Sequence, residues 1–174
     1  MNGEELAIEG DLALRGDRVE IQLERQIDHS PARVWAMLTD SVHLASWLAP
    51  GVIEQRPGGR VQLEFGNSGT PIDCYIRACE PPRLLAYSWS AGDDPERPLT
   101  WELDALGDSG EATRLRLTLS LPNDELVPIA CAGWDAHLEM LMAALEGISI
   151  HFPADRFRLA RAVFSELAKE KLAA

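Results

Sequence analysis

Aromatic and titratable side chains are the residues of this sequence best suited to chemistry with a small molecule. Five of the aromatic residues are tryptophan, which combines a large apolar ring with one N–H donor and suits the wall of an amphipathic ligand pocket. A histidine one helical turn after a tryptophan could donate a hydrogen bond or transfer a proton there. We predict a small-molecule site built from Trp47, Phe65, Trp89, Trp101, Trp134 and His137.

Each of these residues also has a simpler structural role. Tryptophan is highly buried in most proteins, and packing in the core explains the group without any ligand. Trp35 belongs to the core by its place in a helical stripe, whereas Trp89, Trp101 and Trp134 are the stronger pocket candidates, because strands near a long helix face the gap beside it. A histidine at the edge of a buried stripe most often touches solvent or a backbone carbonyl, so His137 has the same two interpretations.

Motifs for other chemistries are missing from the sequence. There is no nucleophile elbow, phosphate-binding loop or HExxH segment, the four histidines are far apart, and the three cysteines form no CxxC pair. We therefore expect no metal site and no cofactor. The carboxylates Asp73, Glu102 and Asp135 could face inward, although strand alternation places Glu102 on the face opposite to Trp101. The sequence assigns no catalytic residue and leaves open whether the protein is an enzyme.

The composition is that of one domain with a modest extension. The chain has 174 residues, of which 46% are hydrophobic and 25% charged, and a net charge of -12. A chain of this length can bury a substantial core. Its negative charge disfavours nucleic acid and anionic membranes, and no apolar run is long enough to cross a bilayer. The acidic N-terminus predicts no secretory signal, and unpaired cysteines favour a cytoplasmic location.

Local patterns predict the elements that would position the site. Residues 19–24 alternate between apolar and polar side chains, as in a half-buried strand. Ser30 followed by Pro31 is a helix start, and a second short helix is expected over residues 40–48. Short alternating segments separated by turns rich in glycine and proline fill residues 57–121, which predicts an antiparallel sheet.

Two further helices are predicted after the sheet. The first has one apolar stripe, made by Trp134, Leu138, Leu141, Leu145 and Ile148. The second spans residues 155–172, and its stripe consists of Phe157, Ala160, Phe164 and Leu167. An isolated helix of this length is marginal in water, so it must pack on its own domain or on a second copy. We expect a homodimer interface anchored by Phe157 and Phe164, because two aromatic residues on one exposed stripe are unusual for a monomer.

Several short motifs occur in a defined order along residues 18–148. They are Arg25, Ser30-Pro31, Val34-Trp35, Leu38-Thr39-Asp40, Leu44 and Trp47, then Gly58-Gly59-Arg60, Glu80-Pro81-Pro82-Arg83-Leu84, Trp89, Thr113-Arg114-Leu115, Gly133-Trp134, Leu138 and Leu141. In this order they resemble the SRPBCC or START-like superfamily. The closer resemblance is to its AHSA-type branch, the homologues of the activator of a heat-shock chaperone ATPase.

This resemblance implies an α+β helix-grip fold, in which a curved antiparallel sheet surrounds a long C-terminal helix. Here we expect a lead-in over residues 1–17, the helix-grip domain over residues 18–150 and an extra helical extension over residues 151–174. Members of the superfamily bind apolar ligands between sheet and helix. Some members cyclise polyketides, and some bind a chaperone.

The leading hypothesis is a cytoplasmic protein that binds a small apolar or amphipathic molecule between sheet and helix, without a cofactor. The first alternative is a cyclase- or hydrolase-like enzyme that uses His137 and carboxylates of the cavity. The second is a chaperone-related interaction module that uses the acidic surface. A closed apolar cavity above roughly 300 Å³ favours a ligand, whereas a filled gap beside an exposed apolar patch favours a protein partner.

Overall fold

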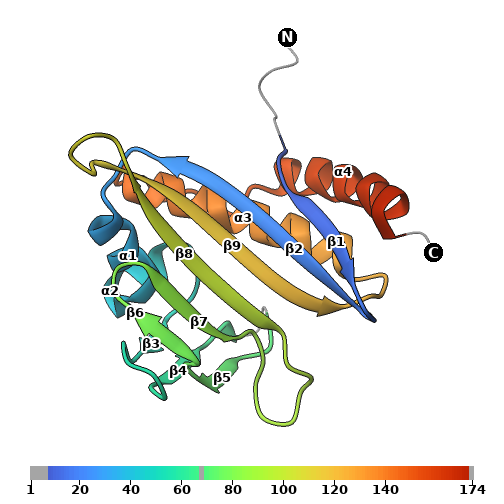
Figure 1. Cartoon of the computed structure of the whole chain (residues 1–174), viewed down its shortest axis with the longest axis horizontal. Helices are drawn as coiled ribbons and strands as arrows, with labels where there is room; N and C mark the ends of the chain where they lie inside the picture. The colour runs from blue at the N-terminus through green and yellow to red at the C-terminus, as the bar shows by residue number, and fades with distance from the viewer. Residues whose placement is uncertain (1–7, 67–68, 173–174) are drawn as a thin grey trace.

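A six-stranded antiparallel sheet curves around one long helix, which confirms the predicted α+β helix-grip fold (Figure 1). The computed structural model describes residues 8–66 and 69–172 of the chain. The sheet has the order β1-β2-β9-β8-β7-β6, and the helix behind it is α3 (Val127–Leu145). The strands are β1 (Asp11–Arg15), β2 (Arg18–Ile27), β9 (Ala112–Pro122), β8 (Pro98–Leu106), β7 (Leu84–Ser88) and β6 (Ala78–Glu80).

A smaller sheet of three antiparallel strands adjoins the large one, with β3 (Gly51–Ile53), β4 (Arg60–Leu63) and β5 (Ile72–Tyr75) in that order. The chain over residues 72–80 therefore forms two strands that belong to different sheets, β5 and β6. The reason is a change of hydrogen-bond partner: the Ile76 N–H donates to Gly59 O, whereas the next N–H, of Arg77, donates to Ala86 O. The chain crosses between the sheets at this point.

Two short helices follow β2, as their capping residues predict. In α1 (Pro31–Thr39), the Ser30 hydroxyl accepts a hydrogen bond from the Arg33 N–H at 3.3 Å. In α2 (Ser41–Trp47), an Asp40 carboxylate oxygen accepts from the Val42 N–H at 3.0 Å. These bonds satisfy amides that have no partner within a helix. The two helices close one end of the sheet (Figure 1).

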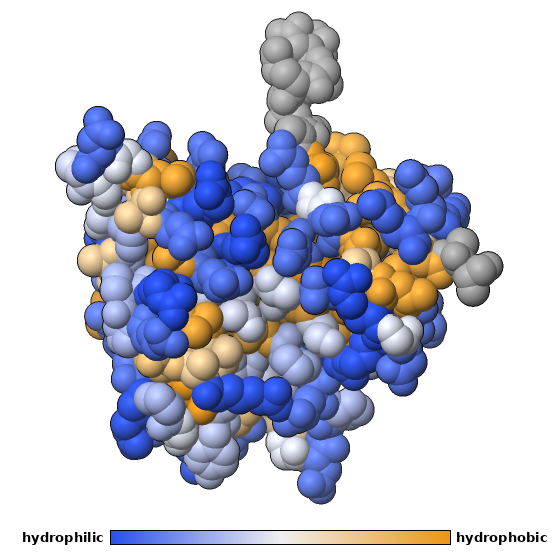
Figure 2. All heavy atoms as spheres, viewed as in Figure 1, coloured by the Kyte–Doolittle hydropathy of each residue, from blue (hydrophilic) through white to orange (hydrophobic). Residues whose placement is uncertain are grey.

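The core lies between α3 and the inner face of the large sheet. Alternate residues of β2 and β9 are buried, among them Val19, Ile21, Leu23, Leu115, Leu117 and Leu119. Polar and charged residues between them face outward, so the outer surface of the sheet is largely hydrophilic (Figure 2). This period-2 pattern fixes the strand register, because a slip of one residue would turn the apolar set toward water.

The buried stripe of α3 matches the sequence pattern except at its last position. Trp134, Leu138, Leu141 and Leu145 are all buried, but Ile148 is 56% exposed. The helix ends earlier because Gly147 adopts a φ of +76°. There the Gly147 N–H donates to Ala144 O and the Ile148 N–H to Ala143 O, which is a Schellman stop.

The last helix, α4 (Ala154–Leu172), packs against α3 and β1 of its own chain (Figure 1). Ala160 and Phe164 are buried in that contact. Gly10 allows it, because a Cβ atom at this position would lie 2.9 Å from the Phe164 ring. Phe164 therefore anchors the helix within the chain, contrary to the expectation of an exposed aromatic stripe.

Dimerisation through α4 stays a prediction. The apolar side chains that α4 exposes to a second copy are not the predicted anchor Phe164. Leu159 is 44% exposed and Val163 42%, and Leu14 on the neighbouring β1 is 41% exposed. Hydrophobic residues gather on the viewed surface beside β1 and α4 (Figure 2). A second copy would meet these side chains and not the buried Phe164.

A buried carboxylate connects the sheet, the long helix and the last helix. Asp135 on α3 is fully buried. Its Oδ1 lies 2.6 Å from the Arg25 guanidinium on β2, and its Oδ2 lies 2.7 Å from Nε of Arg156 on α4. Arg156 also reaches Glu139 at 3.3 Å. The pairing with Asp135 raises the pKa of Arg156, which keeps the positive charge in place.

Replacing Asp135 with Asn should lower the free energy of unfolding by about 3–5 kcal/mol, because two largely buried arginines lose their counter-charge. Urea denaturation measures this loss. Glu139→Gln is the matched control: it also removes a carboxylate that contacts Arg156, but one that is 31% exposed, and it should cost under about 1 kcal/mol. Equal losses in the two variants would contradict a special role for Asp135.

Candidate functional site

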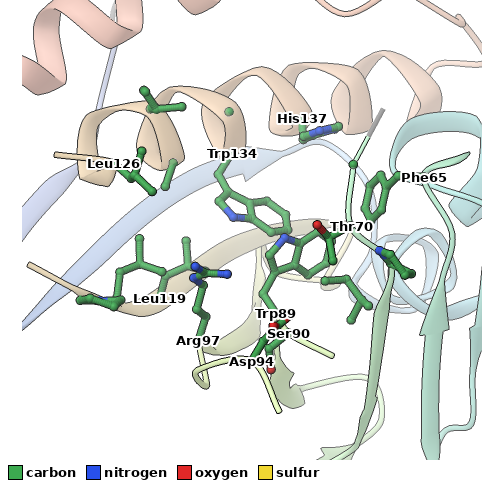
Figure 3. Close-up of a pocket in the computed structure, with 18 of the residues that line it drawn as sticks. Phe65, Thr70, Trp89, Ser90, Asp94, Arg97, Leu119, Leu126, Trp134 and His137 are labelled. Atoms are coloured by element: carbon green, nitrogen blue, oxygen red, sulfur yellow. The ribbon is translucent and has the colours of Figure 1, made fainter. Parts of the chain in front are cut away.

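A partly open pocket of about 560 Å³ lies between the first half of α3 and the strand ends that face it (Figure 3). Three parts of the chain complete its wall: the loop between β4 and β5, the loop between β7 and β8, and the end of β9. The lining residues are Phe65, Gly69, Thr70, Pro71, Ile72, Trp89, Ser90, Asp94, Arg97, Leu119, Leu121, Pro122, Asp124, Leu126, Ile129, Ala130, Gly133, Trp134 and His137.

One face of α3 forms the first wall of the pocket. Its lining residues recur every three or four positions, at Leu126, Ile129, Ala130, Gly133, Trp134 and His137, which places them on one side of the helix. Gly133 leaves room in the middle of this face, because a Cβ atom built there would meet nothing within 4 Å. The space beside this glycine is therefore part of the pocket.

The hairpin between β7 and β8 forms the opposite wall. The Trp89 N–H donates to Arg97 O at 2.8 Å, and the Arg97 N–H donates to the Ser88 hydroxyl at 2.9 Å. The Ser88 hydroxyl in turn lies 2.7 Å from the hydroxyl of Ser90. These bonds hold the backbones of Trp89 and Arg97 against each other. Both side chains then reach the pocket from neighbouring positions (Figure 3).

An aromatic cluster spans the two walls. The rings of Trp89 and Trp134 meet edge to face, with centroids 4.8 Å apart. Phe65 packs on Trp89 at 5.7 Å, and His137 lies beside Trp134 at 6.1 Å. Aromatic pairs at such distances and angles are favourable beyond their buried area. The pocket therefore has a wall of packed rings rather than of mobile side chains.

The structure separates the six predicted site residues into two groups. Four of them line the pocket: Phe65, Trp89, Trp134 and His137. Trp47 and Trp101 are not among the lining residues and are each 1% exposed. Trp47 donates its indole N–H to Met37 O at 2.7 Å, and its ring packs edge to face on Trp101. Contact between a ligand and any of the six stays a prediction.

His137 occupies the position where the pocket meets the core. Its Nδ1 lies 3.2 Å from the carbonyl oxygen of Trp47. Because a carbonyl only accepts, Nδ1 carries the hydrogen in this contact, and Nε2 is then the acceptor nitrogen of the neutral ring. Burial lowers the pKa of His137 below its ordinary value, against a smaller opposing effect of the Trp47 carbonyl. The neutral imidazole is thus the favoured form in the folded protein.

Sequence reasoning missed Arg97 and Gly133. Arg97 lies in a charged loop, and only the strand register, which pairs Ser88 with Pro98, brings it beside Trp89. The sequence does contain a signal for Gly133 as a lining residue. Gly133 precedes Trp134 and lies four positions before His137 on the same helical face.

Residues 8–66 and 69–172 contain no group of three or more His, Cys, Asp or Glu side chains placed to hold a metal ion. Within the same ranges, no helix combines the length and apolar character of a membrane span.

A curved sheet that grips a long helix, with a pocket between them, defines the helix-grip fold. The chain belongs to the family described as activator of Hsp90 ATPase homolog 1-like protein, whose model matches residues 28–146. This match confirms the family resemblance inferred from the sequence motifs. Among curated proteins, none matches the chain.

Solved structures share the fold over most of the chain. CalU16 from Micromonospora echinospora is 20% identical, and the alignment covers 98% of this chain and 100% of that one with a TM-score of 0.76. MLL2253 from Mesorhizobium loti is 27% identical over 75% of this chain and 99% of that one, with a TM-score of 0.63. DynU16, described as a protein in the dynemicin biosynthetic locus, is 27% identical over 78% of this chain but 49% of its own, with a TM-score of 0.66.

The lowered pKa of His137 predicts how stability depends on pH. Below its ordinary pKa of about 6.5 the unfolded chain takes up a proton more readily than the folded one. The contribution of His137 to stability is therefore complete above that pH and falls as the pH drops toward the folded-state pKa. Urea denaturation from pH 8 to pH 5 should show that His137→Gln removes this part of the pH dependence.

His151→Gln is the control for this experiment, because His151 is exposed and lies outside the pocket lining. It should keep the loss of stability at low pH that depends on His137. A wild-type and a His137→Gln profile of the same shape would show that the imidazole is not held neutral.

Proposed function

We propose that the protein binds a small apolar or amphipathic molecule in the pocket between α3 and the sheet. The observation that carries this proposal is the aromatic-walled pocket of about 560 Å³. Small-molecule sites in proteins typically measure roughly 300–1,000 Å³ and combine apolar walls with a few polar groups. The described residues do not fill the gap between α3 and the sheet. A filled gap would have favoured a protein partner instead.

The chemistry of the wall supports an amphipathic ligand. Trp89 and Trp134 offer ring surface, and Leu119, Leu121 and Leu126 offer aliphatic surface on the other side of the pocket. Polar groups lie at few places, so they would orient a bound molecule without demanding many hydrogen bonds. Apolar burial would supply most of the affinity.

The relatives support a role with small molecules. DynU16 is described as a protein in a biosynthetic locus, that of dynemicin. The 27% identity to DynU16 covers 78% of this chain and so includes most of the helix-grip fold. The presence of a similar protein in a biosynthetic locus supports a small-molecule role for this chain.

A cyclase- or hydrolase-like reaction in the same pocket is the second candidate. His137 favours it, because a neutral imidazole at the pocket wall has an acceptor nitrogen that could take a proton from a bound substrate. Its Nδ1 contact with the Trp47 carbonyl would fix the ring in one tautomer. Turnover that is lost in His137→Gln while ligand binding persists would distinguish this candidate from binding alone.

Filling the pocket from Gly133 tests the binding proposal. Gly133→Leu should place an isobutyl group in the empty space without a backbone clash. It should weaken binding of N-phenyl-1-naphthylamine, an apolar fluorescent probe, by about tenfold or more, which corresponds to about 1.4 kcal/mol. Energy transfer from tryptophan to the probe provides the measurement.

Gly133→Ala is the matched control, because a methyl group leaves most of the pocket open. This variant should bind the probe as the wild type does and should gain about 0.5–1 kcal/mol of stability, since glycine disfavours helix interiors. Equal probe affinity in the wild type and in a folded Gly133→Leu variant would show that the probe binds elsewhere and would remove the basis of the proposal.

A further inference from the structure

We propose that the ligand of this pocket carries a carboxylate that pairs with Arg97, next to a planar apolar body that packs on Trp89 and Trp134. This inference rests on the proposed binding function and adds the chemical class of the ligand. It follows from the position of one guanidinium, from its lack of a partner within the described residues, and from the rings beside it.

Arg97 is held in place by its main chain rather than by its side chain. Its N–H donates to the Ser88 hydroxyl, and its carbonyl accepts from the Trp89 N–H. The side chain extends from this fixed point toward α3 and lies among the residues that line the pocket, as Trp134 does (Figure 3). A fixed backbone reduces the conformational freedom that binding would otherwise have to remove.

Within residues 8–66 and 69–172, no hydrogen bond or ion pair to the Arg97 guanidinium is found, whereas nearby arginines are paired. Arg18 donates to Ser120, and Arg77 pairs with Glu96. An arginine side chain is always charged and offers five N–H donors. A half-buried guanidinium at a pocket wall, with its donors directed toward the pocket, fits an acceptor supplied by a ligand.

The charges around the pocket favour one carboxylate over a more highly charged anion. Two carboxylates, Asp94 and Asp124, line the rim and are exposed. Asp124 is engaged at the start of α3, where it accepts from the Leu126 N–H at 2.8 Å. The two aspartates repel a phosphate group with two negative charges more strongly than a carboxylate with one, and a single arginine offsets only one charge. The planar fork of arginine also matches a carboxylate with two parallel hydrogen bonds.

The rings next to Arg97 favour a planar body for the same ligand. Trp89 and Trp134 are 4.8 Å apart at an interplanar angle of 68°, so they meet as a corner rather than as a stack. A flat apolar group placed against this corner would contact the face of one ring and the edge of the other. Its carboxylate would then lie at the Arg97 end of the corner (Figure 3).

A pair of probes of equal shape tests this inference. Anthracene-2-carboxylate and anthracene-2-carboxamide differ chiefly in charge, and both can be titrated by quenching of tryptophan fluorescence. The wild type should bind the carboxylate about tenfold more tightly, corresponding to about 1.4 kcal/mol, and added sodium chloride should reduce this preference. Arg97→Gln should abolish the preference and leave the affinity for the carboxamide unchanged.

Arg83→Gln is the control, because it removes the same charge from an exposed arginine that pairs with Glu80 outside the pocket lining. It should keep the full preference. Arg97→Lys keeps the charge but lacks the planar fork, so it should retain only part of the preference.

The possible results separate the two proposals. Equal wild-type affinity for the two probes, or a preference that survives in Arg97→Gln, overturns the carboxylate inference while the pocket stays a binding site. An equal loss for both probes in Arg97→Gln also overturns it, because the side chain would then act by packing. Failure of the wild type to bind either probe overturns the proposed function itself.

Discussion

The buried carboxylate of Asp135 fixes the long helix relative to its surroundings. It joins α3 to Arg25 on the sheet and to Arg156 on the last helix through contacts of 2.6 and 2.7 Å. Rotation or sliding of α3 would separate these charges in a poorly hydrated interior, which is costly. By helix geometry, the opposite side of α3 carries Gly133 and His137. The ion cluster therefore holds the pocket-facing side of the helix toward the pocket.

Tryptophan serves two purposes in this fold, packing in the core and lining the pocket. Which purpose it serves depends on whether the residue lies within a strand or just beyond its end. Trp101 lies within the paired part of β8, where α3 covers the sheet, and it is buried. Trp89 lies just beyond the last residue of β7, and its side chain lines the pocket. Trp134 contacts both of them, with ring centroids 5.8 Å from Trp101 and 4.8 Å from Trp89. It connects the core to the pocket wall.

Local patterns in the sequence predict most of this fold, because alternation and capping act over a few residues. The strand at residues 19–24 and the Ser30 cap are examples that the structure confirms. The features that complete the site depend on distant partners. Asp135 pairs with Arg25 across 110 positions, and Arg97 reaches Trp89 only through the register of a hairpin. No local period contains that information, so the sequence predicted part of the aromatic wall and missed its charged group.

The indole N–H signals of the five tryptophans in a nitrogen–proton correlation spectrum test the pocket most directly. During titration with anthracene-2-carboxylate, we expect the signals of Trp89 and Trp134 to shift, because these two line the pocket. Those of Trp35 and Trp47 should stay in place, since their N–H groups are bonded to Gln55 and to the Met37 carbonyl. Shifts confined to Trp35 or Trp47, or no shift at Trp89 and Trp134 at saturation, would contradict a ligand site between α3 and the sheet.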